Sequence, residues 1–243
     1  MALFRRQHEE EALQPAEPGE DRQVPLGRDE LTVLTAPRSA IAEQYRRLRN
    51  SIQALNPDGA PRTVVVTSSQ RGEGKTVGLL NLALAMAEMP RVKVLAVDAD
   101  LYRPALESYL GLPRRQGLTE LLRGKLHMDQ GIRATSVEGL SVLGAGELPR
   151  NSSKLLGSDR IRSVLHSLKQ RFDYVLIDTP PALAITDASL LGAAADGILM
   201  VVRMGSTPRH LVEQTHNLLE NLGGNVLGTC LTGLPLDDNA YQY

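Results

Sequence analysis

Apolar residues recur along this 243-residue chain in two patterns. Between the strand-like runs, spaced apolar positions predict helices near residues 75–88, 104–110, 158–170, 186–195 and 208–222. Runs rich in Val, Leu and Ile predict strands buried on both faces near residues 63–68, 92–98, 140–143, 173–178, 197–203 and 225–232. Because strands and helices alternate, we predict an α/β fold with a mostly parallel sheet and helices on both faces.

A further helix is expected to begin at Ser39, because apolar side chains return there at spacings of four and three. These side chains are Ile41, Tyr45, Leu48, Ile52 and Leu55. The turn-forming sequence Asn56-Pro57-Asp58-Gly59 ends this helix.

The two ends of the chain differ in composition from its centre. Residues 1–30 are rich in Glu and Pro and have almost no periodic apolar pattern, which is typical of a flexible segment. The last residues, LPLDDNAYQY, favour an irregular terminus. We therefore expect a flexible arm at 1–34, one folded domain at 35–236 and a flexible tail at 237–243.

The segment Thr63–Thr76 reads TVVVTSSQRGEGKT, a strand, a glycine-containing loop and a Gly-Lys-Thr triplet before an apolar helix. This order of parts is a P-loop, in which backbone N–H groups and the lysine hold phosphates while the threonine hydroxyl holds Mg²⁺. The usual first glycine is Ser69, which can serve if its φ angle is ordinary, so we interpret a variant P-loop of an NTPase-like fold. We expect ATP and Mg²⁺ as cofactors. The nucleotide-binding residues are predicted to be Gln70, Arg71, Gly72, Glu73, Gly74, Lys75, Thr76 and Val77.

Two further predicted strands end in aspartate: VKVLAVDADLYRP holds Asp98 and Asp100, and FDYVLIDTPP holds Asp178. Ligands of parallel sheets collect at the carboxyl ends of strands, so these carboxylates are expected to face the P-loop. Thr76, Asp98 and Asp178 are the predicted Mg²⁺ ligands. Asp98 and Asp100 are suited to orienting an attacking hydroxyl and accepting its proton, which gives Lys75, Asp98, Asp100 and Asp178 as the candidate catalytic residues.

The bulk composition restricts the partners. A net charge of −1 gives no reason to expect nucleic acid. The single cysteine suits a reducing compartment, and no stretch approaches the ~18 apolar residues of a membrane span. We expect a cytoplasmic protein that reaches the inner face of a membrane through a partner.

Two of the six tyrosines, Tyr241 and Tyr243, lie in the last three residues. A tyrosine on a mobile acidic tail can enter a kinase site. The alternative is that both aromatic rings pack on the protein surface.

Together these motifs resemble the bacterial tyrosine kinase (BY-kinase) family, P-loop autokinases linked to capsule and exopolysaccharide synthesis. The resemblance runs from about Ser39 to Tyr243 and rests on SSQRGEGKT, VLAVDADLYRP and DYVLIDTPP in that order. It is supported by GLTELL at 117–122, LPRNSSKLLGSDRI at 148–161 and the final LDDNAYQY. One departure is Tyr102, which stands where the family usually has arginine.

The resemblance implies an ATP-dependent protein-tyrosine autokinase that regulates exopolysaccharide or capsule synthesis. Tyr241 and Tyr243 would be its phosphate acceptors. Glu43, Arg46 and Arg49 match the family's E-x-x-R-x-x-R helix, which packs subunits into a ring so that each tail reaches a neighbouring site. Other implied partners are protein substrates with tyrosines and a separate membrane activator.

Two other readings remain open. A ParA/MinD-type positioning ATPase shares the fold, but its signature lysine is missing here, where Gln70, Arg71 and Gly72 occupy the aligned positions. MinD-like chains also end in a basic amphipathic helix, whereas this chain ends acidic. The third reading is a nucleotide-sensing scaffold without catalysis, which has no need of all five of Lys75, Thr76, Asp98, Asp100 and Asp178.

Overall fold

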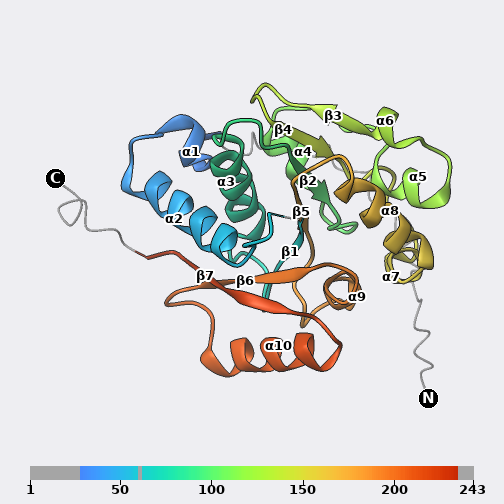
Figure 1. Cartoon of the computed structure of the whole chain (residues 1–243). Coiled ribbons are helices and arrows are strands. Elements are labelled where there is room, and N and C mark those ends of the chain that lie inside the picture. The colour runs from blue at the N-terminus through green and yellow to red at the C-terminus, as the bar shows by residue number, and fades with distance from the viewer. Residues whose placement is uncertain (1–27, 60–61, 235–243) are drawn as a thin grey trace, which may run out of the picture.

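The computed structural model describes residues 28–59 and 62–234. Seven strands form one sheet in the order β3-β4-β2-β5-β1-β6-β7. Every neighbouring pair is parallel except β3 with β4. The prediction of an α/β fold with a mostly parallel sheet is confirmed (Figure 1).

All six predicted strands are present with boundaries close to those expected. β1, β2, β5 and β6 are buried almost throughout, as expected for parallel strands covered on both faces, whereas β7 at the end of the sheet is partly exposed. The six strands are β1 (Arg62–Ser68), β2 (Val94–Asp98), β4 (Leu140–Leu143), β5 (Tyr174–Asp178), β6 (Gly197–Arg203) and β7 (Val226–Thr232).

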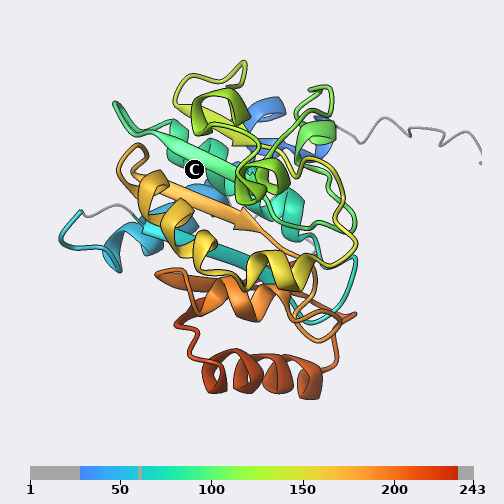
Figure 2. The same cartoon turned by 90° about the vertical axis from the view of Figure 1, so that its right-hand side faces the viewer.

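The predicted helices are also present and divide between the two faces of the sheet. One face is covered by α2 (Ala40–Ala54), α3 (Lys75–Ala87) and α4 (Leu106–Tyr109). The other is covered by α8 (Asp159–Lys169), α9 (Asp187–Gly192) and α10 (Arg209–Asn221). Alternate residues of each strand face opposite layers, so Val64 and Val66 join the first core while Val65 joins the second. In Figure 2 the gold α8 and the orange α9 lie in front of the sheet.

Several short elements were not predicted, because three to six residues are too few to establish a helical or strand period. These elements are η1 (Arg28–Glu30), α1 (Thr32–Thr35), α5 (Leu118–Arg123), α6 (Met128–Gly131), β3 (Ile132–Ala134) and α7 (Ser152–Leu156).

Residues 28–34, expected as the end of the flexible arm, are largely helical in the structure. Leu31 and Val33 are only 1% and 6% exposed, because they pack into the core beneath α2 and α3. The amide of Asn81 on α3 fixes this segment by donating to Glu30 O at 2.9 Å and accepting from Val33 N at 3.0 Å. The folded part therefore includes residues 28–34, while residues 1–27 lie outside the described part.

The GLTELL segment is closely packed against the loop that follows β4. Leu118 N donates to Gly144 O at 2.8 Å. The carboxylate of Glu120 is buried and accepts from Gly117 N at 2.7 Å and from Glu147 N at 3.0 Å. This carboxylate therefore joins the start of α5 to the carboxyl edge of the sheet.

Gly117 is required by this packing, which a substitution can test. A Cβ added there would lie 2.0 Å from Gly144 O, and both backbones would have to move. We expect Gly117→Ala to lower the free energy of unfolding by about 2–3 kcal/mol, measured by urea unfolding. Gly78→Ala on α3 is the control, because an added Cβ meets nothing within 4 Å there. We expect this variant to be as stable as the wild type or up to about 1 kcal/mol more stable, since alanine favours a helix more than glycine does. Equal stabilities for the two variants would contradict this account.

Candidate active site

The loop between β1 and α3 has the backbone of a phosphate-binding turn. Gly72 and Gly74 have φ of 78° and 89°, the left-handed region that glycine adopts without steric cost. Gly74 immediately precedes α3, whose first N–H groups are free to bind an anion. Ser69 does not have a positive φ, so the condition for a variant P-loop is met. Its hydroxyl is 2.8 Å from Thr215 Oγ1 on α10.

Glu73, predicted among the nucleotide-binding residues, directs its side chain into the loop itself. It is only 2% exposed, and its carboxylate accepts from Gln70 N at 3.0 Å and from the hydroxyl of Thr207. An anion in this position would repel a phosphate if it faced one. Glu73 therefore shapes the loop by binding its backbone.

One residue on β6 and one on β7 also hold this loop, and the sequence analysis did not identify them. Arg203 Nη1 donates to Gly72 O at 3.0 Å, and Thr232 Oγ1 donates to Glu73 O at 2.7 Å. Both side chains follow or end strands at the carboxyl edge, which was the available signal. The loop is therefore fixed by strands more than 100 residues away in the sequence.

The two strand-end carboxylates meet, as predicted. Asp98 and Asp178 are paired positions on the adjacent strands β2 and β5. Thr76 Oγ1 donates to Asp178 Oδ2 at 2.6 Å. Asp98 Oδ2 accepts from the backbone N–H groups of Ala105 and Leu106, at 2.9 and 3.0 Å. The P-loop threonine and both carboxylates therefore belong to one site.

These carboxylates are deeply buried, at 0% exposure for Asp98 and 1% for Asp178. Burial raises the pKa of Asp178 to about 7, although the Thr76 hydrogen bond and the Lys75 ammonium oppose the rise. Burial, and then repulsion by Asp178, hold the pKa of Asp98 well above its ordinary value. Within the described residues, the Oδ1 atom of each carboxylate has no hydrogen-bond partner. Such a pair is costly unless a cation neutralises it.

The donor set fits Mg²⁺. Carboxylate and hydroxyl oxygens are the ligands that Mg²⁺ prefers, and Thr76, Asp98 and Asp178 supply them. In the segments 28–59 and 62–234, no cluster of three or more His, Cys, Asp or Glu forms a metal site from protein alone. Mg²⁺ usually completes its shell with water and substrate phosphates, so this site suits a metal that arrives with a nucleotide.

A pocket of about 190 Å³ opens beside these carboxylates. Lys75 and Asp100 both line it, so the four candidate catalytic residues come together at one edge of the sheet. Asp100 Oδ1 accepts from the N–H groups of Tyr102 and Arg103, at 3.2 and 3.0 Å, which fixes the turn after β2. The remaining residues that line the pocket are Arg71, Gly72, Tyr102, Arg103, Pro180, Pro181 and Ile185.

Tyr102, the residue in place of the family's arginine, binds a neighbouring helix. Its hydroxyl accepts a hydrogen bond from Ser152 Oγ at 2.9 Å, at the start of α7. Arg103 lines the pocket from the next position. A cation is therefore present beside Asp100, shifted by one residue from the family's pattern.

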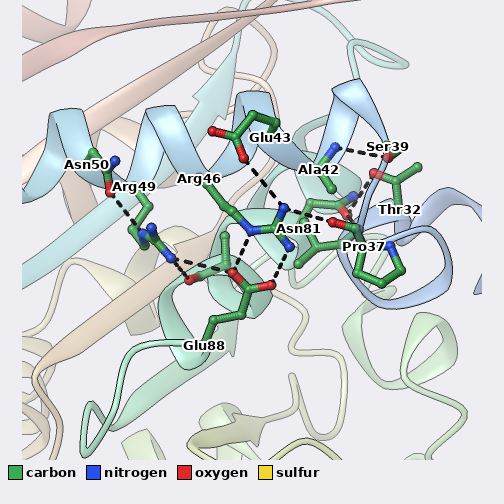
Figure 3. Close-up of polar contacts among 12 residues, drawn as sticks. Thr32, Pro37, Ser39, Ala42, Glu43, Arg46, Arg49, Asn50, Asn81 and Glu88 are labelled. Atoms are coloured by element: carbon green, nitrogen blue, oxygen red, sulfur yellow. Dashed lines mark hydrogen bonds and ion pairs between the residues drawn. The ribbon is translucent and has the colours of Figure 1, made fainter. Parts of the chain in front are cut away.

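Glu43, Arg46 and Arg49 lie on α2, and both arginines point toward the end of α3 (Figure 3). Arg46 donates to both oxygens of Glu88, at 2.8 and 2.7 Å. Arg49 Nη1 donates to Ala85 O at 2.9 Å and lies 3.5 Å from Glu88 Oε2. Glu43 Oε2 lies 3.6 Å from Arg46 Nη1. The arginines thus stabilise the packing of α2 on α3 and bind the carbonyl end of α3.

A contact of these residues with another subunit stays a prediction, since the described contacts are all within one chain. The predicted acceptors Tyr241 and Tyr243 lie outside the described residues, as does the tail 237–243. None of the helices in 28–59 and 62–234 combines the length and apolar character needed to cross a membrane.

Known proteins are similar in sequence to this chain over most of its length. Residues 61–224 match the AAA_31 family model, an AAA domain. The tyrosine-protein kinase YwqD of Bacillus subtilis (strain 168) is 34% identical over 211 residues, covering 86% of this chain and 89% of YwqD. The tyrosine-protein kinase etk of Escherichia coli (strain K12) is 32% identical over 208 residues, which are 85% of this chain but only 28% of etk.

Solved structures of tyrosine kinases are also similar to this chain. The chimerical protein CapA2B2 superposes with a TM-score of 0.80 at 33% identity, covering 86% of this chain and 91% of the chimera. The kinase domain of the Escherichia coli tyrosine kinase ETK also gives 0.80, at 31% identity and coverage of 84% and 80%. The septum site-determining protein MinD of Pyrococcus horikoshii OT3, solved with Mg-ADP, reaches only 0.61 at 28% identity, covering 70% of each chain.

The Arg46–Glu88 contact can be tested by removing one charge. In Glu88→Gln, Arg46 loses the carboxylate that accepts two of its hydrogen bonds, and its one other ion pair among the described residues is the longer contact with Glu43. We expect the free energy of unfolding to fall by about 0.5–1 kcal/mol at neutral pH because the Arg46 and Glu88 side chains are partly exposed. The hydrogen bond from Arg46 lowers the pKa of Glu88. The stabilisation is therefore present above the carboxyl's ordinary pKa and is lost as the pH falls through the lowered value.

Urea unfolding over a range of pH checks this expectation, and the difference between wild type and variant should shrink in acid. Glu213→Gln is the control, since the Arg209–Glu213 pair on α10 is more exposed and contributes less. A Glu88→Gln effect equal to that of the control would show that Arg46 gains nothing from the pairing.

Proposed function

The chain belongs to the bacterial tyrosine-protein kinases and contains an AAA domain, and we propose that it transfers the γ-phosphoryl group of Mg·ATP to Tyr241 and Tyr243 of neighbouring copies. The family and the kinase activity follow from the similarities. The acceptors, the metal and the transfer between copies are the proposal.

One observation supports the proposal most strongly. The P-loop threonine, two buried strand-end carboxylates and a pocket lined by Lys75 and Asp100 occupy the same edge of the sheet. The buried Oδ1 atoms of Asp98 and Asp178 have no hydrogen-bond partner in the described part of the chain. They fit a site that takes up a cation together with a phosphate ligand.

In this mechanism the chain positions the reactants and neutralises charge. The backbone N–H groups of the loop and of the first turn of α3 hold the phosphates, and Lys75 binds the outer phosphates. Thr76, Asp98 and Asp178 hold Mg²⁺, which when bound stabilises the negative charge on the phosphate oxygens. Asp100, fixed by two backbone hydrogen bonds, orients the tyrosine hydroxyl and accepts its proton.

The same proposal includes the setting of the reaction. Copies of the chain assemble through the face of α2 that carries Glu43, and a separate membrane protein activates them at the inner face of the cell membrane. The chimerical protein CapA2B2 is among the similar structures. The capsule and exopolysaccharide role rests on the family resemblance. Each added phosphate, near −1.5 to −2 charge, would repel neighbouring acidic tails and loosen the assembly.

Loss of the phosphate ligand or of one metal ligand tests the site. We expect purified chain to gain phosphotyrosine with Mg·ATP, and Lys75→Met or Asp98→Asn to reduce the rate by at least about 100-fold. Asp98→Asn should remain folded, because it removes repulsion from Asp178. Mass-spectrometric mapping identifies the sites, and the exposed Lys93→Met is the control. Phosphate release without phosphotyrosine would favour a ParA/MinD-type ATPase instead.

Transfer between copies has its own test. We mix a Lys75→Met chain, which keeps its tail but not its lysine, with a chain that lacks residues 238–243. Phosphate should appear on the Lys75→Met chain alone, because only the other chain can transfer it and only this one has acceptors. Neither chain alone should be labelled. An unlabelled mixture would contradict transfer between copies.

A further inference from the structure

A groove near the active-site pocket carries an excess of positive charge. It has a volume of about 560 Å³ and lies among α5, the loop after β4, α7 and the start of α8. Figure 1 shows these three helices grouped on one side of the molecule. We call it the cationic groove, defined by Arg123, Arg150, Lys154 and Arg160.

Most of this charge is not neutralised by carboxylates in the described part of the chain. Among the described residues, Glu147 supplies the one carboxylate that lines the groove, and it is paired with Arg123 at 3.1 Å. Arg150, Lys154 and Arg160 are exposed, and their side chains make no ion pair with any residue of 28–59 or 62–234. Three neighbouring cations repel one another, so an acidic ligand is favoured there.

The groove also offers an apolar contact. Leu122 and Leu155 line it, and Leu148 at its edge is 43% exposed. An extended peptide with both acidic and apolar side chains matches this combination better than a free anion does.

The cationic groove adjoins the pocket that contains Lys75 and Asp100. Ser152 joins them: its hydroxyl binds Tyr102, which lines that pocket, while its neighbours Asn151 and Lys154 line the groove. Both lie at the carboxyl edge of the sheet, since the groove includes the loop after β4 and β4 pairs with β2. Tyr102 and Ser152 therefore lie between the pocket and the groove.

We propose that the cationic groove binds Asp237 and Asp238 in the tail of a second copy while Tyr241 or Tyr243 occupies the pocket. This inference rests on the proposed function. Asp238 precedes Tyr241 by three residues, which in an extended chain span roughly 10 Å. The groove thus selects tyrosines that follow acidic residues.

The tail is the occupant because it combines carboxylates with tyrosines over a short distance. The N-terminal segment 1–27 is also acidic but contains no tyrosine, so it cannot fill the groove and the pocket together as an acceptor. Charge complementarity alone would allow either segment, and adjacency to the pocket favours the tail.

Peptide binding and phosphorylation test the proposal. The acceptor peptide has the sequence of residues 235–243, and a matched peptide carries Asp237→Asn and Asp238→Asn. The kinase is the full chain with Tyr241→Phe and Tyr243→Phe, so that it does not label itself. We expect the KM to be about 10-fold lower for the acidic peptide with kcat nearly equal, since roughly two exposed ion pairs are involved.

Arg150→Gln with Lys154→Gln in this kinase should remove the preference, giving both peptides the same KM. Lys154→Gln alone should reduce it, whereas Arg209→Gln, an equal loss of charge on α10, should leave it unchanged. A preference that survives the double substitution, or that is absent from the unaltered groove, overturns the proposal.

Binding without catalysis separates this inference from the proposed function. A fluorescent acidic peptide with phenylalanine at both tyrosine positions should bind the unaltered groove about 10-fold more tightly than the double variant, by anisotropy. If that holds while no peptide is phosphorylated, the kinase assignment fails and the groove does not. If a peptide of residues 8–21 displaces it from the groove more strongly than the unlabelled tail peptide does, the arm is the occupant and the proposal is wrong.

Discussion

The site depends on two adjacent buried carboxylates, and charging both is costly unless a cation is present. Asp98 and Asp178 end adjacent parallel strands, so the sheet itself brings them together beneath the P-loop. Burial raises the pKa of both; repulsion by Asp178 adds to the rise at Asp98, and repulsion by Asp100 adds to the rise at Asp178. Lys75 offsets part of that cost, and a metal–nucleotide ligand is suited to offset the remainder. The fold thus carries a cost at its carboxyl edge that a ligand can relieve, which is common at functional sites.

The surroundings of that edge are held by hydrogen bonds from several distant segments. Glu73 is held by Thr207, and the backbone of the loop by Arg203 and Thr232, from strands and turns far away in the sequence. Tyr102 is held by Ser152 on α7. The loop and the pocket are therefore held by segments distant from them in the sequence.

Much of this could be predicted from the sequence, and the parts that could not have a common cause. Long apolar runs gave the six strands, and the strand ends gave Asp98 and Asp178, because burial and sheet direction act on local patterns. The roles of Glu73 and Thr232 depend on contacts between distant segments, which no local pattern encodes. Arg46 and Arg49 show the same limit, since their partner Glu88 lies on another helix. Leu31 and Val33 were missed because one short helix has no period.

The end of β7 lies close to two functional segments: it contacts the loop between β1 and α3 in space, and it is followed in the sequence by the acidic tail. Its last residue, Thr232, binds the backbone of the nucleotide loop, and the acidic tail begins only a few residues later. A substitution that displaces the end of β7 would therefore also release the carbonyl of Glu73, in the loop before α3, from its hydrogen bond with Thr232.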